Sequence, residues 1–172
     1  MKNKFLILLF VFSFSIFGDT NNSSIKPIKE LIKFEKFLGK TFIASIENKR
    51  NDSLGYEINR WELAFKGDAI KIYQKINSNE LIGESTIMFD QEIEQFSCWY
   101  FSSGGVSRKL KLINNDNQII FLEDVSKNNN SITKIRIKYE FIKIDTYIKI
   151  TQYLINNVWT NGSEVYFREL LD

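Results

Sequence analysis

The segment SCWYFSSGG, residues 97–105, holds residue types that often do chemistry in proteins: a thiol, three serine hydroxyls and a glycine pair. Cys98 is the only cysteine of the chain. A nucleophilic thiol needs a neighbouring base or a helix N-terminus that lowers its pKa. Cys98 instead alternates with Phe96 and Tyr100, which predicts a small packing residue on the same strand face as two aromatic rings.

Gly104 and Gly105 raise the question of a phosphate-binding loop. Such loops place glycines in a fixed frame at the start of a helix. Here the flanking residues alternate as strands do, and the frame is missing. We therefore expect a hairpin with a primed turn, which needs positive φ at its central residues.

The chain contains no histidine. This removes the commonest general base and the commonest ligand of zinc, copper and haem iron, so we expect no cofactor. Enzyme chemistry would have to use carboxylates, two of which could face each other inside a barrel as in a glycoside hydrolase. The alternative is that these side chains are solvated on outer faces and turns. The candidates are Glu57, Glu62, Glu84 and Glu94.

The first 18 residues predict a secretory signal peptide, because Lys2 and Lys4 precede the apolar run 5–17 and Gly18 ends it. A membrane anchor is the alternative, but about 13 residues fall short of the ~20 that a spanning helix needs. We therefore expect residues 19–172 to form one exported domain, in the periplasm or the medium, without a stable membrane anchor after cleavage.

Charge is balanced in the expected mature domain. The chain has 23 Lys and Arg against 21 Asp and Glu, and the leader carries two of the lysines and no acid. A domain without excess charge exerts little long-range attraction on nucleic acid or anionic lipid, so we expect neither partner. A lone cysteine offers no intramolecular disulfide, so packing must hold the domain together. The sequence carries no signal for an oligomeric state.

One amphipathic helix is predicted over Pro27–Leu38, with Ser24 as its cap and Gly39 at its end. We expect it to cover the open end of a β-structure; the alternative is binding to a membrane surface. The residues expected on its buried face are Ile28, Leu31, Ile32, Glu35 and Leu38.

Beyond Gly39 the hydrophobic period changes to two, and clusters of Asn, Asp, Gly and Ser separate short alternating runs. Consecutive tight turns pair each strand with its neighbour. This predicts an all-β fold, an antiparallel up-and-down barrel of about eight to ten strands with the short N-terminal helix. The expected strands are 41–46, 60–65, 69–76, 84–89, 94–102, 107–113, 118–124, 131–141, 146–155 and 164–169.

Five phrases then occur in a familiar order: FLGK at 37–40, RWELAFKGDAIKI at 60–72, GESTIMFD at 83–90, YFSSGG at 100–105 and VYFREL at 165–170. Together they resemble lipocalin-like, calycin-type secreted bacterial domains of unknown function. The resemblance implies a calycin barrel and no catalytic set. Related haem-binding barrels use a histidine ligand, which this chain lacks.

Large amphipathic residues on the predicted strands could line the interior and give a pocket aromatic walls with cationic groups. They are Trp99, Arg60, Tyr73, Arg136, Tyr166 and Arg168. We therefore expect a non-enzymatic binding module for a small, partly hydrophobic or carboxylate-bearing ligand. The alternative is a structural or protein-interaction domain, in which aromatic residues fill the barrel and the arginines pair outside with Glu62, Glu84 or Glu140. Trp61 is expected in the core and Trp159 in a loop.

Overall fold

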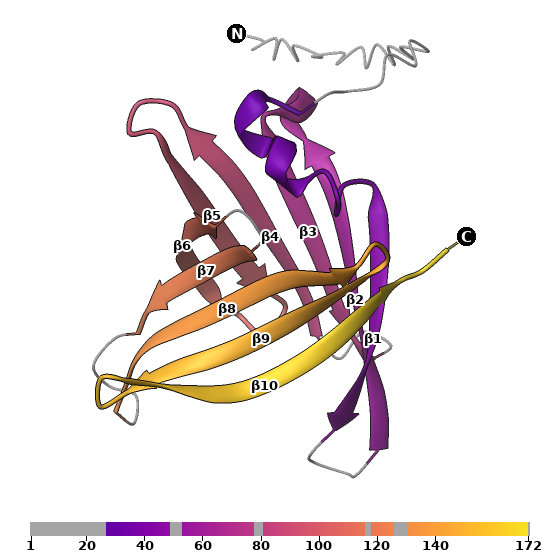
Figure 1. Cartoon of the computed structure of the whole chain (residues 1–172), viewed down its shortest axis with the longest axis vertical. Coiled ribbons are helices and arrows are strands. Elements are labelled where there is room, and N and C mark those ends of the chain that lie inside the picture. Colours follow the sequence, from indigo (N-terminus) through magenta and orange to yellow (C-terminus); the bar gives the residue numbers. More distant parts are fainter. Residues whose placement is uncertain (1–26, 49–52, 78–80, 116–117, 126–130, 172) are drawn as a thin grey trace, which may run out of the picture.

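The computed structural model describes residues 27–48, 53–77, 81–115, 118–125 and 131–171. In these ranges ten antiparallel strands follow one another in chain order around a closed barrel, and β10 returns to pair with β1 (Figure 1). The predicted up-and-down barrel is confirmed. The expected signal peptide and Ser24 lie outside the described residues. No helix in the described ranges is long and apolar enough to cross a membrane.

The strands have close to the predicted bounds. They are β1 Lys40–Asn48, β2 Ser53–Ala64, β3 Ala69–Ile76, β4 Leu81–Asp90, β5 Gln95–Ser102, β6 Ser107–Asn115, β7 Gln118–Asp124, β8 Ile132–Lys143, β9 Thr146–Ile155 and β10 Val158–Glu169. The largest differences are in β2, which starts at Ser53 rather than at 60, and in β10, which starts at Val158 rather than at 164. A register shift between Asn161 and Ser163 lets this strand continue through a polar Asn-Gly-Ser sequence. Trp159 therefore lies in a strand and not in a loop.

The N-terminal helix is shorter and tighter than predicted. It is a 3-10 helix, η1 Lys29–Phe34, followed by turns up to the first strand. Leu31, Phe34 and Phe37 are all buried, and their spacing of three matches the three residues per turn of a 3-10 helix. Ile32, expected on the buried face of an α-helix, is 48% exposed.

The η1 helix and the turns that follow it up to Gly39, here called the η1 segment, cover one end of the barrel, as predicted. The Ile28 N–H donates to the Gly67 carbonyl at 3.1 Å, which joins the segment to the second 3-10 turn, η2 Phe65–Gly67. The Phe37 ring enters the barrel and stacks on Trp61 with ring centroids 4.3 Å apart. It also packs against Phe141 at 4.5 Å.

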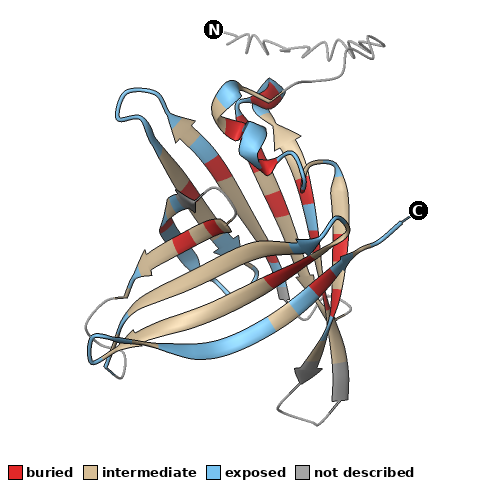
Figure 2. Cartoon of the chain, viewed as in Figure 1, coloured by how far each residue is buried: buried red, intermediate tan, exposed pale blue. Residues whose placement is uncertain are grey.

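Aromatic side chains fill this end of the barrel. Trp61 is fully buried, which confirms its predicted place in the core. Tyr147 and Phe167 stack in parallel at 4.8 Å, and Tyr147 meets the edge of Phe42 at 4.9 Å. Such ring pairs add about 0.5–1.5 kcal/mol each beyond the burial of apolar area. Figure 2 shows buried segments in η1 and on strands around the barrel, whereas β10 is exposed over much of its length.

The SSGG segment forms the β5–β6 hairpin, as predicted, but its turn is not of the primed type. Of the two glycines only Gly105 has positive φ, at 75°. The Gly105 N–H donates to the Ser102 carbonyl at 3.0 Å, and the Ser102 N–H donates to the Val106 carbonyl at 3.0 Å. This is the pattern of a longer hairpin loop closed by a glycine in the left-handed region.

Candidate functional site

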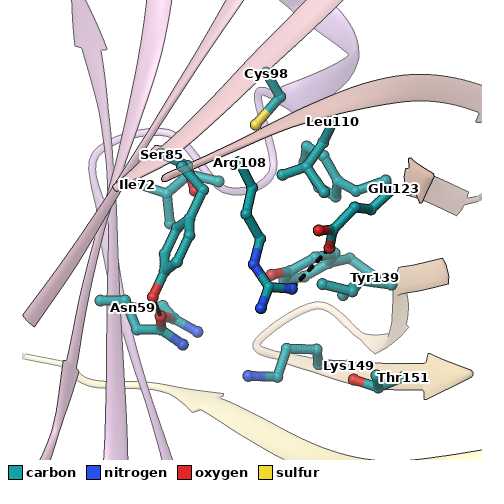
Figure 3. Close-up of a pocket in the computed structure, with 14 residues that line it drawn as sticks. Asn59, Ile72, Ser85, Cys98, Arg108, Leu110, Glu123, Tyr139, Lys149 and Thr151 are labelled. Atoms are coloured by element: carbon teal, nitrogen blue, oxygen red, sulfur yellow. Dashed lines mark hydrogen bonds and ion pairs between the residues drawn. The ribbon is translucent and has the colours of Figure 1, made fainter. Parts of the chain in front are cut away.

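A cavity of about 310 Å³ occupies the barrel interior beside the aromatic cluster. Strands β2 to β9 all contribute to its lining (Figure 3). Its apolar wall consists of Ile72, Cys98, Leu110, Phe121, Ile137 and Tyr139. Its polar lining consists of Asn59, Gln74, Ser85, Tyr100, Arg108, Glu123, Lys149 and Thr151.

Strand alternation places the polar groups inside. Asn59 lies two residues from the buried Trp61, and Lys149 lies two residues from the buried Tyr147. Residues two apart on a strand share a face, so each polar side chain points inward beside a core residue. Arg108 is related to the buried Leu110 in the same way.

A buried ion pair stands at the edge of this cavity. The Lys149 Nζ contacts both carboxylate oxygens of Glu57, at 2.5 and 2.7 Å. The Glu57 side chain is only 5% exposed and that of Lys149 13%. Burying such charges is costly unless each is paired and its remaining hydrogen-bonding capacity is used.

Two amides complete the hydrogen bonding of Glu57. The Gln74 Nε2 donates to its Oε1 at 2.8 Å, and the Asn59 Nδ2 donates to the same oxygen at 3.2 Å. The network extends further, because the Tyr100 hydroxyl donates to the Gln74 Oε1 at 3.1 Å and Asn59 also donates to the Tyr147 hydroxyl at 3.2 Å. These bonds fix the orientation of the polar groups on this side of the cavity.

A second ion pair lies across the cavity. The Arg108 Nη1 donates to the Glu123 Oε2 at 2.7 Å. The Arg108 side chain is 41% exposed and that of Glu123 is 15% exposed, so this pair is more open to water than the first. In Figure 3 the guanidinium of Arg108 extends into the space between Asn59 and Glu123, with Lys149 beyond it. Two cationic groups from β6 and β9 thus face one cavity.

The tyrosines of the interior keep their protons. Burial raises the pKa of Tyr139 well above its ordinary value, and burial likewise raises the pKa of Tyr147. The pKa of Tyr100 is also raised, mainly by burial. At neutral pH these side chains are therefore neutral hydroxyls that donate or accept hydrogen bonds.

Cys98 is a buried packing residue, as its alternation with Phe96 and Tyr100 predicts. Burial raises the pKa of its thiol to about 12, against a smaller opposing effect of a hydrogen bond with Ser85. The side chain forms part of the cavity wall, where a neutral thiol presents an apolar surface.

None of the six side chains expected to line the pocket contributes to the inner cavity. Arg60 and Tyr73 lie together on the outer face, with the guanidinium 4.9 Å from the ring centroid, and Arg60 also pairs with Glu62. The structure brings Tyr166 and Arg168 together in a groove between β1 and β10.

The other two lie apart on the outer surface. Arg136 stacks over Trp159 at 4.1 Å and donates to Gln152. Trp99 points away from the cavity, since Cys98 and Tyr100 on either side of it line the wall, and Lys109 lies 5.5 Å from its ring.

The four glutamates considered for carboxylate chemistry do not come together. Glu57 is inside, Glu62 pairs with Arg60, Glu84 pairs with Lys71, and Glu94 is exposed in the β4–β5 turn. Within the described residues no group of three or more Cys, Asp and Glu side chains gathers as metal ligands would.

The interior polar set was missed by the sequence reasoning, although a signal for it existed. The buried core residues Trp61, Leu110 and Tyr147 fix which alternate positions face inward. Asn59, Arg108 and Lys149 are in phase with them. The six residues expected to line the pocket were chosen for their size and charge, and they lie at the alternate strand positions that face outward. No family model matches the chain, and no curated protein matches its sequence.

Proposed function

We propose that this protein is an exported, lipocalin-like binding module that takes up one small, partly hydrophobic molecule bearing a carboxylate, without catalysing its conversion. The observation that carries the proposal is the cavity of about 310 Å³, which Arg108 and Lys149 face from different strands. Ligand sites in proteins are typically concave, mostly apolar spaces of about 300–1,000 Å³ with a few placed polar groups. A compact ligand fits this volume.

Arg108 is the residue best suited to recognise the carboxylate. A guanidinium has five N–H donors, and Glu123 receives only one of them in the described structure. Because its side chain is partly exposed, Arg108 can turn donors toward a ligand without breaking a buried pair. Lys149 also lines the cavity, but its ammonium is held by both carboxylate oxygens of the buried Glu57 and is less free to turn toward a ligand.

The apolar part of the ligand would contact the opposite lining. Phe121, Leu110 and Ile137 offer aliphatic and aromatic surface, and Tyr139 adds a partly buried ring. Removing apolar ligand surface from water contributes about 25 cal/mol per Å². The site therefore favours a molecule with one anionic end and one compact hydrophobic end.

The lipocalin-like family and the export of the protein are supported by features other than the cavity. The motif order that resembles calycin domains fits the closed barrel covered at one end by η1. The N-terminal residues have the pattern of a signal peptide. A domain with a filled barrel, acting only as a structural or protein-interaction unit, is the competing function, and the aromatic cluster at the η1 end favours it for that end alone.

Titration with simple acids tests the proposal. We expect octanoate and 3-phenylpropanoate to shift NMR signals of cavity residues, and their neutral amides to bind more weakly. Arg108→Met should lower the affinity for the acids about tenfold or more, because hydrogen bonds to charged groups contribute about 1.5–3 kcal/mol. The matched control is Arg60→Met, which removes an outward-facing guanidinium.

Two results would contradict this function. One is equal binding of acids by the Arg108 and Arg60 variants. The other is a set of shifts confined to the outer surface while the signals of cavity residues such as Leu110 and Thr151 stay unchanged.

A further inference from the structure

The barrel is closed by a short seam. Strands β1 and β10 share only two residue pairs, Phe42 with Glu169 and Ile43 with Arg168, whereas β1 pairs with β2 along its whole length. Beyond these pairs the two strands diverge (Figure 1). A groove of about 450 Å³ lies between residues 43–45 of β1 and four residues of β10, which are Glu164, Val165, Tyr166 and Arg168.

Backbone groups of both strands point into this groove. The Leu170 N–H donates to the Thr41 carbonyl across the seam at 2.8 Å. In antiparallel strands, alternate residues direct their N–H and C=O groups at the same neighbour. Ser45 on β1 is in phase with Thr41, and Tyr166 and Glu164 on β10 are in phase with Leu170. Beyond the last pair these groups face a position where a strand would normally lie.

The side chains around the groove alternate in character. Ala44 is buried and Val165 packs against the core, so the inward side is small and apolar. Ser45 and Tyr166 are exposed on the outward side. Glu164 and Arg168 bring opposite charges to the groove, and neither takes part in an ion pair within the described ranges.

We propose that this groove binds an extended peptide segment, which adds a short strand between β1 and β10. Strand addition obtains affinity from main-chain hydrogen bonds and selectivity from alternate side chains. The preferred segment has small apolar residues that face inward beside Ala44 and Val165. Its outward residues are polar, with a cation near Glu164 and an anion near Arg168.

The occupant is a free segment rather than a strand of a second copy. A strand inserted between β1 and β10 must offer hydrogen-bonding groups on both edges. In a second barrel each strand already pairs with at least one neighbour, as β1 does with β2 and β10 with β9. A chain end or an extended loop has both edges available.

A designed pentapeptide tests the proposal. The probe is acetyl-KVTVE-amide, whose valines would face inward and whose charges would match the groove. We expect it to shift the backbone amide signals of Ser45, Glu164 and Tyr166 and to slow their hydrogen exchange about tenfold or more. The control peptide is N-methylated at alternate residues, so it keeps the side chains and loses the donors on one edge.

Two protein variants separate backbone pairing from side-chain contact. Ser45→Pro removes a donor that faces the groove, and proline is tolerated at such an edge position. It should weaken peptide binding tenfold or more, whereas Ser45→Ala, which keeps the N–H, should bind as the unchanged protein does. Unaltered seam amides at millimolar peptide, or equal binding by Ser45→Pro, would overturn the proposal. Protection of these amides that rises with protein concentration without peptide would also overturn it, since it would identify a second copy as the occupant.

Discussion

The Lys149 ammonium lies 2.5 and 2.7 Å from the two carboxylate oxygens of Glu57, with both side chains almost fully buried inside the barrel. The pair joins β9 to β2, strands that are not neighbours in the sheet. It therefore spans the interior and helps to fix the shape of the cavity wall.

Removing either partner of this pair should be strongly destabilising. Glu57→Gln leaves a buried ammonium without its counter-charge, and such losses cost about 3–5 kcal/mol. The free energy of unfolding in urea measures the effect. The double variant Glu57→Gln with Lys149→Met leaves no isolated buried charge. Its loss in the free energy of unfolding should therefore be clearly smaller than the sum of the losses in the two single variants.

The exposed pair of Arg60 and Glu62 provides the control. Its side chains are 53% and 40% exposed, so Glu62→Gln should cost at most about 1 kcal/mol. Equal losses for Glu57→Gln and Glu62→Gln would show that the inner pair has no special structural role.

The thiol of Cys98 should make stability depend on alkaline pH. Its pKa is raised from 9.0 to about 12 in the folded protein, so between these values the unfolded chain loses a proton that the folded chain keeps. Stability must then fall as the pH rises above about 9, by up to about 1.4 kcal/mol per pH unit for this one group. Urea unfolding at pH 8 and pH 10 measures the slope, and Cys98→Ala should reduce it.

The same burial predicts a slow reaction with iodoacetamide. We expect the native thiol at pH 8 to react at least about a hundredfold more slowly than the urea-unfolded chain, since the thiolate is the reactive form. A native rate close to the unfolded rate would contradict the buried position of Cys98.

The η1 segment should contribute much of the stability through one ring. Phe37 is 2% exposed and packs on Trp61 and Phe141, so Phe37→Ala should cost about 3–5 kcal/mol through lost burial and a cavity. Ile32 is half exposed on the same segment, and Ile32→Ala should cost much less. Thermal unfolding of both variants checks the contrast, and similar losses would argue that η1 does not insert into the barrel.

The SSGG turn needs glycine at one of its two glycine positions. Gly105 has a φ of 75°, and a Cβ there would meet no heavy atom within 4 Å, so Gly105→Ala should cost about 1–2 kcal/mol from backbone strain alone. Gly104 does not have positive φ, and Gly104→Ala should be close to neutral. Urea unfolding of the two variants measures the difference, and equal costs would contradict this turn geometry.

The sequence predicted the architecture well because alternation and turn residues act locally. The predicted bounds of β3, β7 and β9 are those observed, and the tight turns give the up-and-down order directly. The starts of β2 and β10 were both missed. In β10 a bulge carries the strand through residues that usually form turns. The helix type was missed because the prediction followed an α-helical face that includes Leu31, Ile32 and Glu35. The residues that are buried instead recur every three positions, at Leu31, Phe34 and Phe37.

The interior was harder to predict because barrel closure decides which buried positions leave space. Alternation correctly grouped Phe96, Cys98 and Tyr100 on one face, but it did not show that this face borders a cavity. The contact of Glu57 with Lys149 joins residues far apart in the chain, and no local pattern predicts such a pair. The position of the cavity and the pairing of Glu57 with Lys149 depend on the strand register and on the insertion of Phe37.

Native mass spectrometry of the folded protein, purified from the cells that produce it, shows whether the cavity holds one small carboxylate-bearing molecule. We expect a reproducible added mass of one small molecule, reduced in Arg108→Met and lost in Ser85→Phe, which fills the cavity from β4. Arg60→Met should keep the added mass. A clean mass of the protein alone in every preparation, or an added mass that survives Ser85→Phe, would contradict a ligand in this cavity.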